Sequence, residues 1–570
     1  MDLIPDYTSW SNDQLVKRVT ELEAQLKRQT AEYSSAKDAS KSQAVLKQTS
    51  PTREGFKKEK KVASRAFDPS KYSTRFIALK FAYLGQRYNG FEHAANNTTP
   101  LPTIEEELWK AFRKTRLIFP SRGAELKDGE IDWTGCEYSK CGRTDRGVSA
   151  FGQVIALRVR SSKPTTKPKK SVVENNEETP GLDDEAMARD EEALEIGDPT
   201  WDSVLDELPY IQLLNRVLPE DIRILAWCPD PPADFSARFS CKERRYRYFF
   251  TQPAYAPVPG ERGMATTVSG RPLRDGWLDI EAMRDAAKRY EGSHDFRNFC
   301  KIDPGKQITN FQRAIYHANI TRVDPHEGPA GYVSSPNFAA TESAAQPDGN
   351  TADFDSFGPP AIYTFDVNGS AFLWHQVRHL VAVLFLVGQG LEHPSVVSDL
   401  LDVTKCPTRP KYEMATDAPL VLWDCIFDSP DDPAPSLRWI HAGSDGGRDT
   451  NKRPDLDGGD AKFGRNGVME MLWALWRQRK IDEVLAGSLM DVVAAQGRAT
   501  SLPFDAVAAA KNKSTRVFDG GHTPRPVGTY VPVMQKARME HFDVVNARYA
   551  QRKGLVGKKT ESAEDVGGDE

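Results

Sequence analysis

Hydrophobic positions recur along the chain with two different spacings, and these predict alternating strands and helices. Thr103 and Glu106 form a capping box ahead of Ile104, Leu108 and Phe112, whose spacing predicts a helix. Alternating or β-branched runs predict strands at 75–84, 153–160, 222–227, 245–250, 314–323 and 362–367. Further helices are expected at 210–216, 280–290 and 371–387. This order predicts an α+β fold in which two units share one mostly antiparallel sheet.

Polar stretches divide the chain into six segments. The first contains a short amphipathic helix with heptad-like spacing from Leu15 to Leu26, and two polar inserts interrupt the folded part. The predicted segments are an N-terminal helix with a basic disordered linker at 1–71, a first folded half with the Asp145 loop at 72–160, an acidic disordered insert at 161–207, a second folded half at 208–430 with a disordered insert at 328–358, a flexible linker at 431–465, and a helical, basic C-terminal extension with a disordered tail at 466–570.

The composition of the 570-residue chain indicates in which compartment of the cell we expect the protein. The longest apolar run, Leu380 to Gly388, is far shorter than the roughly 18 to 20 residues that cross a bilayer. The N-terminus lacks the features of a secretory signal. Seven scattered cysteines without a C-x-x-C pair argue against a disulfide framework and against a zinc site. We expect reduced thiols and a location in the cytoplasm and, given the basic cluster Lys57–Lys61, in the nucleus.

Charge is distributed unevenly along the sequence. The whole chain has a net charge of -5, but Glu174 to Glu207 contains fourteen acidic residues and one basic residue. Removing this segment of net charge -13 leaves +8 for the remainder. A basic body with an acidic, disordered insert is compatible with a polyanionic partner such as a nucleic acid.

The first chemical candidate is the glycine-flanked loop from Gly142 to Val148, which leads into a strand. Arg143 and Asp145 are two residues apart, so in an extended loop they project from the same side, with Arg146 on the other. Taken alone, such a loop is more often a tight turn whose aspartate binds nearby backbone amides.

A second candidate is Arg378, in the predicted helix at 371–387. Apolar residues surround Arg378 at helical spacing on both sides, which predicts a helix that is buried nearly all round. A guanidinium there requires a carboxylate partner, because an unpaired buried charge costs several kcal/mol. Asp145 is a natural partner, although an ordinary structural ion pair would satisfy the same requirement.

A third candidate is the strand Arg245–Phe250, in which basic and aromatic residues alternate. The alternation places Arg245 and Arg247 on one face and Tyr246 and Tyr248 on the other. Such a strand can offer rings to an unstacked base and cations to phosphates. A half-buried structural strand with a solvated arginine face is the alternative.

Together these segments resemble the TruA-like tRNA pseudouridine synthase family. The resemblance rests on the loop sequence Arg143-Thr-Asp145 with Gly147-Val148, the strand Arg245-Tyr-Arg-Tyr248 and the helix Ser370-Ala-Phe-Leu-Trp-His-Gln-Val-Arg378. Ser149 stands where bacterial members usually carry His. The sequence Arg-Gly-Val-Ser-Ala-Phe at 146–151 is similar to that of the eukaryotic branch, which acts on tRNA positions 38 and 39 of the anticodon stem-loop. The segments 529–533 and 544–549 also resemble that branch.

The resemblance implies a pseudouridine synthase fold with two similar α/β halves, a continuous sheet and a central basic cleft. It implies a cofactor-free and metal-free isomerisation of uridine, with Asp145 as nucleophile and with Arg378 and Tyr246 as catalytic partners. Arg143 would fill the stem when the target base is flipped out. Candidate contacts to the tRNA are Arg143, Arg146, Arg244, Arg245, Arg247 and Tyr248. A homodimer is a further expectation from the family.

Three alternatives remain beside this interpretation. The chain could be a synthase of the same family that acts at other tRNA positions, or a non-catalytic tRNA-binding protein on the same fold. A glycosidase would need two carboxylates across a sugar, and the sequence offers only one convincing carboxylate.

Overall fold

The computed structural model describes residues 18, 68–94, 99–120, 126, 130–164, 201–257, 264–323, 360–428, 437–444, 462–464, 467–496 and 515–554. The chain divides into two compact units, Met1–Asp68 and Pro69–Glu570, and every helix and strand named below belongs to the second. The predicted helix at 15–26, apart from the helical Arg18, the acidic stretch 174–198 and the insert 328–358 lie outside the described residues.

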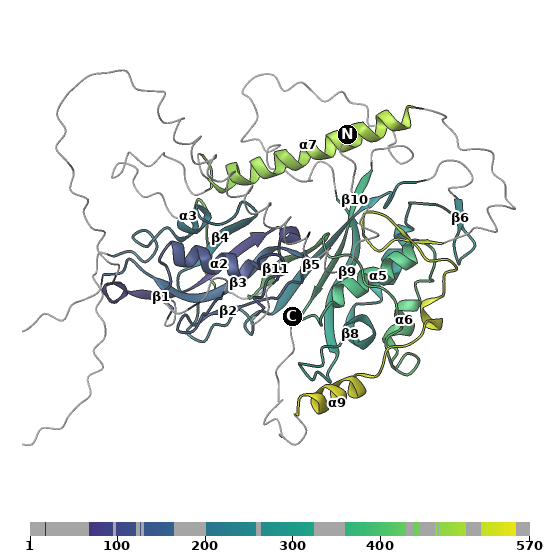
Figure 1. The fold of residues 1–570 in the computed structure, drawn as a ribbon, viewed down its shortest axis with the longest axis horizontal. Coiled ribbons are helices and arrows are strands. Elements are labelled where there is room, and N and C mark those ends of the chain that lie inside the picture. The colour runs from purple at the N-terminus through teal and green to yellow at the C-terminus, as the bar shows by residue number, and fades with distance from the viewer. Residues whose placement is uncertain are drawn as a thin grey trace, which may run out of the picture. The chain divides into compact units, whose positions relative to one another are not determined.

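A ten-stranded sheet organises the second unit (Figure 1). Its strands are β1 (Thr74–Tyr83), β2 (Ser139–Lys140), β3 (Ser149–Arg160), β4 (Ile222–Cys228), β5 (Glu243–Gln252), β8 (Gly292–Asp295), β9 (Gln312–Arg322), β10 (Ala361–Gly369), β11 (Leu420–Ile426) and β12 (Ile440–His441). The order is β12-β4-β1-β3-β11-β5-β10-β9-β8, with β2 paired to β3. Each pairing is antiparallel except that of β11 with β3. The prediction of a mostly antiparallel sheet is therefore confirmed.

Strand β11 has a central place in this sheet because it lies between β3 and β5. It pairs in parallel with the start of β3, where Val421 is opposite Ser149, and antiparallel with β5, where Leu422 is opposite Tyr246. The hydrophobic pattern did not predict a strand at 420–426. The start of β3 follows the Asp145 loop, so β11 links that loop to the strand that carries Tyr246.

Two short hairpins lie outside the main sheet. They are formed by β6 (Met264–Thr266) with β7 (Pro272–Arg274) and by β13 (Arg516–Val517) with β14 (Arg525–Pro526).

The described helices are α2 (Ile104–Lys114), α3 (Tyr210–Asn215), α4 (Ile280–Lys288), α5 (Gln376–Gly388), α6 (Val396–Leu401), α7 (Val468–Ala494) and α9 (Phe542–Arg552). The capping box predicted at Thr103 and Glu106 is confirmed. Helix α5 begins five residues later than predicted, because His375 has a left-handed backbone with φ of 59°. None of the described helices is long and apolar enough to span a bilayer.

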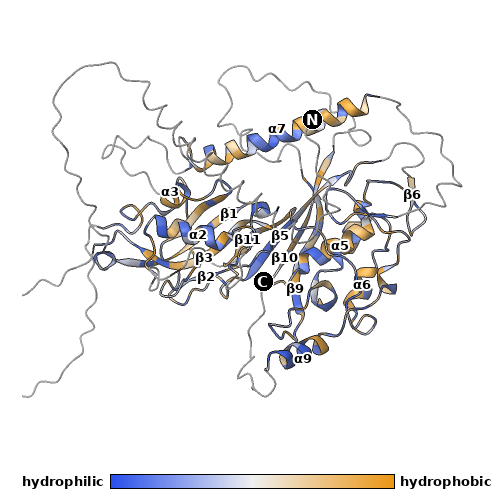
Figure 2. Cartoon of the chain, viewed as in Figure 1, coloured by the Kyte–Doolittle hydropathy of each residue, from blue (hydrophilic) through white to orange (hydrophobic). Residues whose placement is uncertain are grey.

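Helix α5 forms the core of its part of the molecule. All thirteen of its residues are buried, which confirms the prediction of a helix without a solvent-exposed face. Figure 2 shows the hydrophobic character of this helix. The ring of Phe385 packs edge-on against Tyr248 and Phe250 of β5, at centroid distances of 5.7 and 5.6 Å. The buried face of β5 is therefore the face that α5 covers.

The ends of the predicted acidic insert at 161–207 are folded. Residues 161–164 and 201–207 are described, and the buried Glu207 accepts hydrogen bonds from the Ser161 hydroxyl and the Ser162 amide. Glu207 also lies 3.4 Å from the guanidinium of Arg75. These contacts come from residues far apart in sequence, so local composition does not reveal them.

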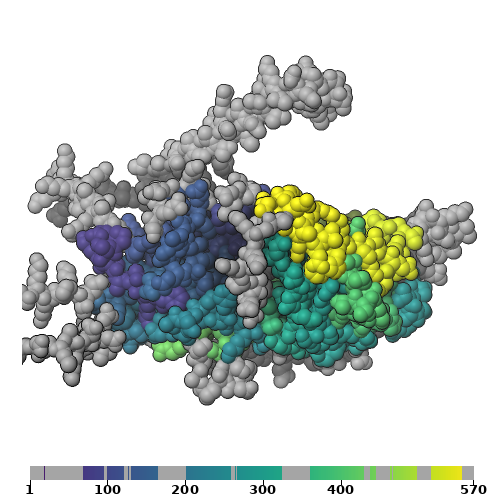
Figure 3. All heavy atoms as spheres, turned by 90° about the horizontal axis from the view of Figure 1, so that it is seen from below, coloured from purple at the N-terminus to yellow at the C-terminus, as the bar shows by residue number. Residues whose placement is uncertain are grey.

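The C-terminal residues 515–554 pack on the region of α5 and α6, as Figure 3 shows for the yellow and green residues. The buried Glu392 accepts hydrogen bonds from the Tyr530 hydroxyl and the Val533 amide, both at 2.6 Å. The Gln389 side chain bonds both main-chain groups of Phe518. Residues 515–554 of the predicted C-terminal extension at 466–570 are therefore joined to the folded body by specific polar contacts.

Candidate active site

The loop that carries Asp145 connects β2 to β3 and is fixed by buried polar groups. The Gln153 side chain on β3 bonds both main-chain groups of Gly142, at 3.0 Å each. The hydroxyls of Tyr83 and Thr144 lie 2.7 Å apart in the core. Buried polar groups that are satisfied in this way hold one backbone conformation. The loop therefore presents the Asp145 carboxylate in a defined position.

Gly147 allows the same loop to approach Asp417 closely. Its φ is +81°, and a Cβ atom there would lie 2.9 Å from Cγ of Asp417. The left-handed backbone and the close contact both favour glycine at this position.

The Asp145 carboxylate faces His375, the residue that precedes α5. Oδ2 of Asp145 lies 3.2 Å from Nε2 of His375, and their side chains are 24% and 10% exposed. A carboxylate only accepts hydrogen bonds, so the contact is attractive when Nε2 carries the hydrogen. Nδ1 of His375 is buried without a hydrogen-bond partner among the described residues, and the ring lies 4.7 Å from that of Trp374. The imidazole is therefore held by ring packing and by the carboxylate.

Arg378 is buried one turn into α5, but its ion-pair partner is Asp417. Nη2 of Arg378 is 3.9 Å from Oδ2 of Asp417, and Nε donates to the Ala415 carbonyl at 2.8 Å. The predicted direct pairing of Arg378 with Asp145 was wrong, because Arg378 pairs with Asp417 and the Asp145 carboxylate lies against His375. The prediction that the buried guanidinium needs a carboxylate is confirmed.

Tyr246 of β5 lines the same hollow as Asp145 and Arg378. It is 8% exposed, and its ring packs edge-on against Phe372 at 5.1 Å. Burial raises the pKa of Tyr246 well above its usual value of 10, since desolvation disfavours the phenolate. The hydroxyl is therefore protonated at neutral pH and can act as a hydrogen-bond donor.

These residues converge on one hollow that is open to solvent. It is lined by Arg143, Thr144, Asp145, Val148, Tyr246, Phe372, Leu373, His375, Gln376, Val377, Arg378 and Leu420. The lining combines one partly exposed carboxylate, two cations and several apolar or aromatic groups. Such a site can hold an unstacked base beside a nucleophile.

The Asp145 loop also carries two arginines, Arg143 and Arg146. Arg143 lines the hollow and lies 3.4 Å from Oε2 of Glu92, while Arg146 is exposed to solvent. Both can reach an approaching RNA, Arg143 after its weak contact with Glu92 is released.

Two of the predicted RNA contacts cannot form because their side chains are buried. Arg244 is 4% exposed and donates to the main-chain carbonyls of Ser370, Cys141 and Arg238. Tyr248 is completely buried against Phe385. The prediction of RNA contacts at Arg244 and Tyr248 was wrong, since β5 directs its even-numbered side chains into the core.

Arg245 and Arg247 lie on the opposite face of β5 from Tyr246, as the alternation predicted. Arg245 is 2.7 Å from Glu243, and Arg247 is 3.0 Å from Asp366. The guanidinium of Arg247 also stacks over the Trp423 ring at 3.9 Å. The structure therefore does not bring these two arginines to the hollow.

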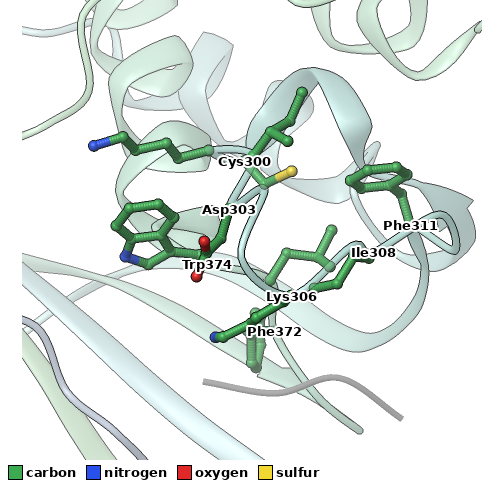
Figure 4. Close-up of a pocket in the computed structure, with 10 residues that line it drawn as sticks. Cys300, Asp303, Lys306, Ile308, Phe311, Phe372 and Trp374 are labelled. Atoms are coloured by element: carbon green, nitrogen blue, oxygen red, sulfur yellow. The ribbon is translucent and has the colours of Figure 1, made fainter. Parts of the chain in front are cut away.

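A second hollow, drawn in Figure 4, adjoins the first, because Phe372 and Leu373 line both. Trp374 lines it, and the ammonium of Lys301 is 4.4 Å from the centre of the Trp374 ring. Apolar surface beside a lysine suits a nucleotide next to the one in the first hollow.

His375 is a site residue that the sequence patterns did not identify. It lies inside the quoted segment 370–378, but nothing in the pattern distinguishes it from its neighbours. A histidine three residues before a buried arginine is a weak signal without knowledge of the left-handed turn.

Comparison with known proteins gives the family. A family model described as tRNA pseudouridine synthase matches residues 286–428. The chain is 36% identical over 554 residues to the Saccharomyces cerevisiae protein named tRNA pseudouridine(38/39) synthase, which covers 97% of this chain and 93% of the yeast protein. It is 37% identical over 429 residues to the Homo sapiens protein of the same name, covering 75% of this chain and 68% of the human protein.

The chain therefore belongs to the tRNA pseudouridine synthase family, which confirms the resemblance seen in the three sequence segments. It is an isomerase with a tRNA substrate. A Caenorhabditis elegans protein named probable tRNA pseudouridine synthase tag-124 is 30% identical over 370 residues, which cover 65% of this chain and 71% of that protein.

The close approach at Gly147 can be tested by substitution with alanine. Gly147→Ala should lower the free energy of unfolding by about 1–2 kcal/mol for the left-handed backbone and by a further ~1–3 kcal/mol for the contact with Asp417. Turnover should fall as well, because the loop carries Asp145. The measurement is denaturant unfolding together with pseudouridine formation.

Gly270→Ala is the matched control, since Gly270 has a φ of +78° and no atom lies within 4 Å of the position that a Cβ would take. It should show only the backbone cost and normal turnover. Equal losses for the two variants would contradict the role given to the Asp417 contact.

Proposed function

We propose that this chain converts uridine to pseudouridine at positions 38 and 39 in the anticodon stem-loop of tRNA, with Asp145 as the nucleophile. The observation that carries the proposal is the convergence of Asp145, Tyr246 and Arg378 on one hollow from a loop, a strand and a helix. The positions are those in the names of the yeast and human relatives.

The reaction is an isomerisation in which atoms and charge balance. The bond from ribose C1′ to N1 of uracil breaks, the base turns, and a bond from C1′ to C5 forms. The C5 proton leaves and N1 gains a proton, so no oxidant or reductant is needed. The Asp145 carboxylate can attack C1′ or a carbon of the uracil ring, and either adduct returns the free carboxylate at the end.

His375 would act as a positioning residue for that nucleophile. Its Nε2 atom is 3.2 Å from one carboxylate oxygen of Asp145, which leaves the other oxygen for the substrate. A fixed carboxylate reaches the reacting carbon without first losing orientational freedom. Arg378 contributes positive charge to the same hollow while Asp417 holds it in place.

Tyr246 would provide a surface for the uracil ring. Its edge-on contact with Phe372 fixes the ring plane, and aromatic rings stack on unpaired bases. The raised pKa of Tyr246 favours stacking and hydrogen-bond donation over proton abstraction by the hydroxyl. Arg143 would replace the flipped base in the stem.

The tRNA backbone would bind in a basic cleft between two similar halves of the sheet, which meet near β11. Arg143, Lys301 and Lys306 line the two hollows, and Arg146 is exposed on the same loop as Arg143. Apart from the acidic segment 174–207, the chain has a net charge of +8. Binding through such residues weakens as the salt concentration rises.

A homodimer would form through α7. Only Val468 of this 27-residue helix is buried. Ile481, Val484, Leu485, Leu489 and Val492 lie along one side at helical spacing, each at least 41% exposed, and form the α7 apolar stripe. A row of exposed apolar residues is rare on a monomer. A second copy of the same helix covers it symmetrically.

The proposed function is tested by mapping pseudouridine on unmodified tRNA transcripts after incubation with the purified chain alone. Modification should appear at positions 38 and 39, and Asp145→Asn should form no product while binding tRNA within a few-fold of the normal affinity. Product at other positions would contradict the positional assignment. Full activity of Asp145→Asn would contradict the mechanism.

The positioning role of His375 predicts a split between kcat and KM. His375→Leu should lower kcat roughly 100-fold, because a nucleophile displaced by about 1 Å loses that much rate, while KM changes little. His375→Gln should recover much of the loss, since its amide nitrogen can donate to the same carboxylate oxygen. Equal defects in both variants, or a change confined to KM, would rule out this role.

The homodimer is tested by light scattering on the full chain. Leu485→Glu places a charge in the α7 apolar stripe and should yield monomers, because burying an unpaired charge is costly. Ala494→Glu puts the same charge on the opposite side of the helix from Leu485, where Ala494 is exposed, and should leave the dimer intact. A wild-type chain that is monomeric at micromolar concentration would refute the proposal.

A further inference from the structure

Three cysteines that are far apart in sequence meet in the core behind the Asp145 loop. Cys141 lies just before that loop, Cys241 just before β5, and Cys425 on β11. All three are buried, and their sulfur atoms lie within 4.8 Å of one another. We refer to them as the three-thiol cluster. Spacing along the chain could not reveal it, because no two members are close in sequence.

We propose that the three-thiol cluster binds a thiophilic d¹⁰ metal ion, with Zn²⁺ as the best-matched ion, in a structural role. Zinc–thiolate bonds are about 2.3 Å long, so sulfur atoms around one ion are separated by roughly 3.8–4.0 Å. The sulfurs would need to move together by less than about 1 Å. This is a small adjustment for side chains that already point at one another.

Arg244 supplies the positive charge that such a site needs. Its guanidinium is 4% exposed, donates to the Cys141 carbonyl at 3.1 Å and interacts electrostatically with all three thiols. Three thiolates and one guanidinium leave a charge of -2, which one divalent ion cancels. A neutral assembly avoids the high cost of burying net charge. This accounts for an arginine that points into the core instead of toward RNA.

The coordination would use three sulfurs and one weaker ligand. Among the described residues, no histidine, carboxylate or further cysteine belongs to the cluster. The main-chain oxygen of Glu243 lies 3.4 Å from Sγ of Cys241, where it accepts a hydrogen bond from that thiol. Zn²⁺ in structural sites is almost always four-coordinate, and this oxygen would take the fourth position.

The alternative is a cluster of ordinary core thiols, since free cysteine packs well as a small apolar residue. Cys136, Cys228, Cys300 and Cys406 are buried in that way, outside the cluster. The three-thiol cluster differs from them by the convergence of sulfur atoms and by the buried Arg244. An ion there would join the Asp145 loop, the Tyr246 strand and β11 at one point without touching the substrate.

The test begins with the full chain purified without chelator. Elemental analysis should find about one equivalent of zinc per chain, and the metal-free chain titrated with Cd²⁺ should develop an ultraviolet cadmium–thiolate charge-transfer band that saturates at one equivalent. Zinc should also raise the melting temperature of the metal-free chain. A wild-type chain that contains no metal and gives no band would overturn the proposal without any substitution.

Two buried cysteine-to-serine variants provide the comparison. Cys241→Ser should lose the bound metal, the cadmium band and the stabilisation by zinc, whereas Cys228→Ser on β4 should retain all three. Retention of one equivalent by Cys241→Ser, with the cadmium band unchanged, would overturn the assignment. If Cys241→Ser does not fold, the titration of the wild-type chain decides the question. These readouts are independent of the proposed activity on tRNA.

Discussion

The position of the Asp145 carboxylate, 3.2 Å from the His375 imidazole, is the constraint on which the rest of the site depends. Asp145 comes from the loop before β3, and His375 comes from the turn before α5. A displacement of about 1 Å in either segment would break this contact, since ion pairs extend to about 4 Å. The loop before β3 and the turn before α5 are each held by their own contacts, and the sheet connects the two.

The joining element is β11, which pairs with the start of β3 on one side and with β5 on the other. This arrangement sets the distance between the Asp145 loop and the Tyr246 ring. Asp417, three residues before β11, contacts both Gly147 of the loop and Arg378 of α5. The buried arginine is therefore coupled to the catalytic loop through an intermediate carboxylate. Within the described part of the chain, the Asp145 carboxylate therefore pairs with His375 and not with a guanidinium.

Much of this site follows from local sequence patterns. Period-two alternation in β5 correctly separates Tyr246 from Arg245 and Arg247, and apolar residues at helical spacing correctly predict the burial of α5. Such patterns do not specify which segments meet. They therefore missed the His375 contact and the three-thiol cluster, and they assigned Arg378 to the wrong carboxylate. The same alternation places Arg244, two residues before Tyr246, on the buried face, so the pattern could have excluded Arg244 as an RNA contact.

The central claim is that the Asp145 carboxylate performs the bond exchange in the hollow, and release of the C5 hydrogen reports on that step directly. tRNA labelled with tritium at C5 of uridine can be mixed with an excess of enzyme, so that a single turnover is followed. The wild-type chain should release one tritium for each pseudouridine formed, and Asp145→Asn should release none although the tRNA is bound. Release by Asp145→Asn at a rate close to that of the wild-type chain would contradict this role of Asp145.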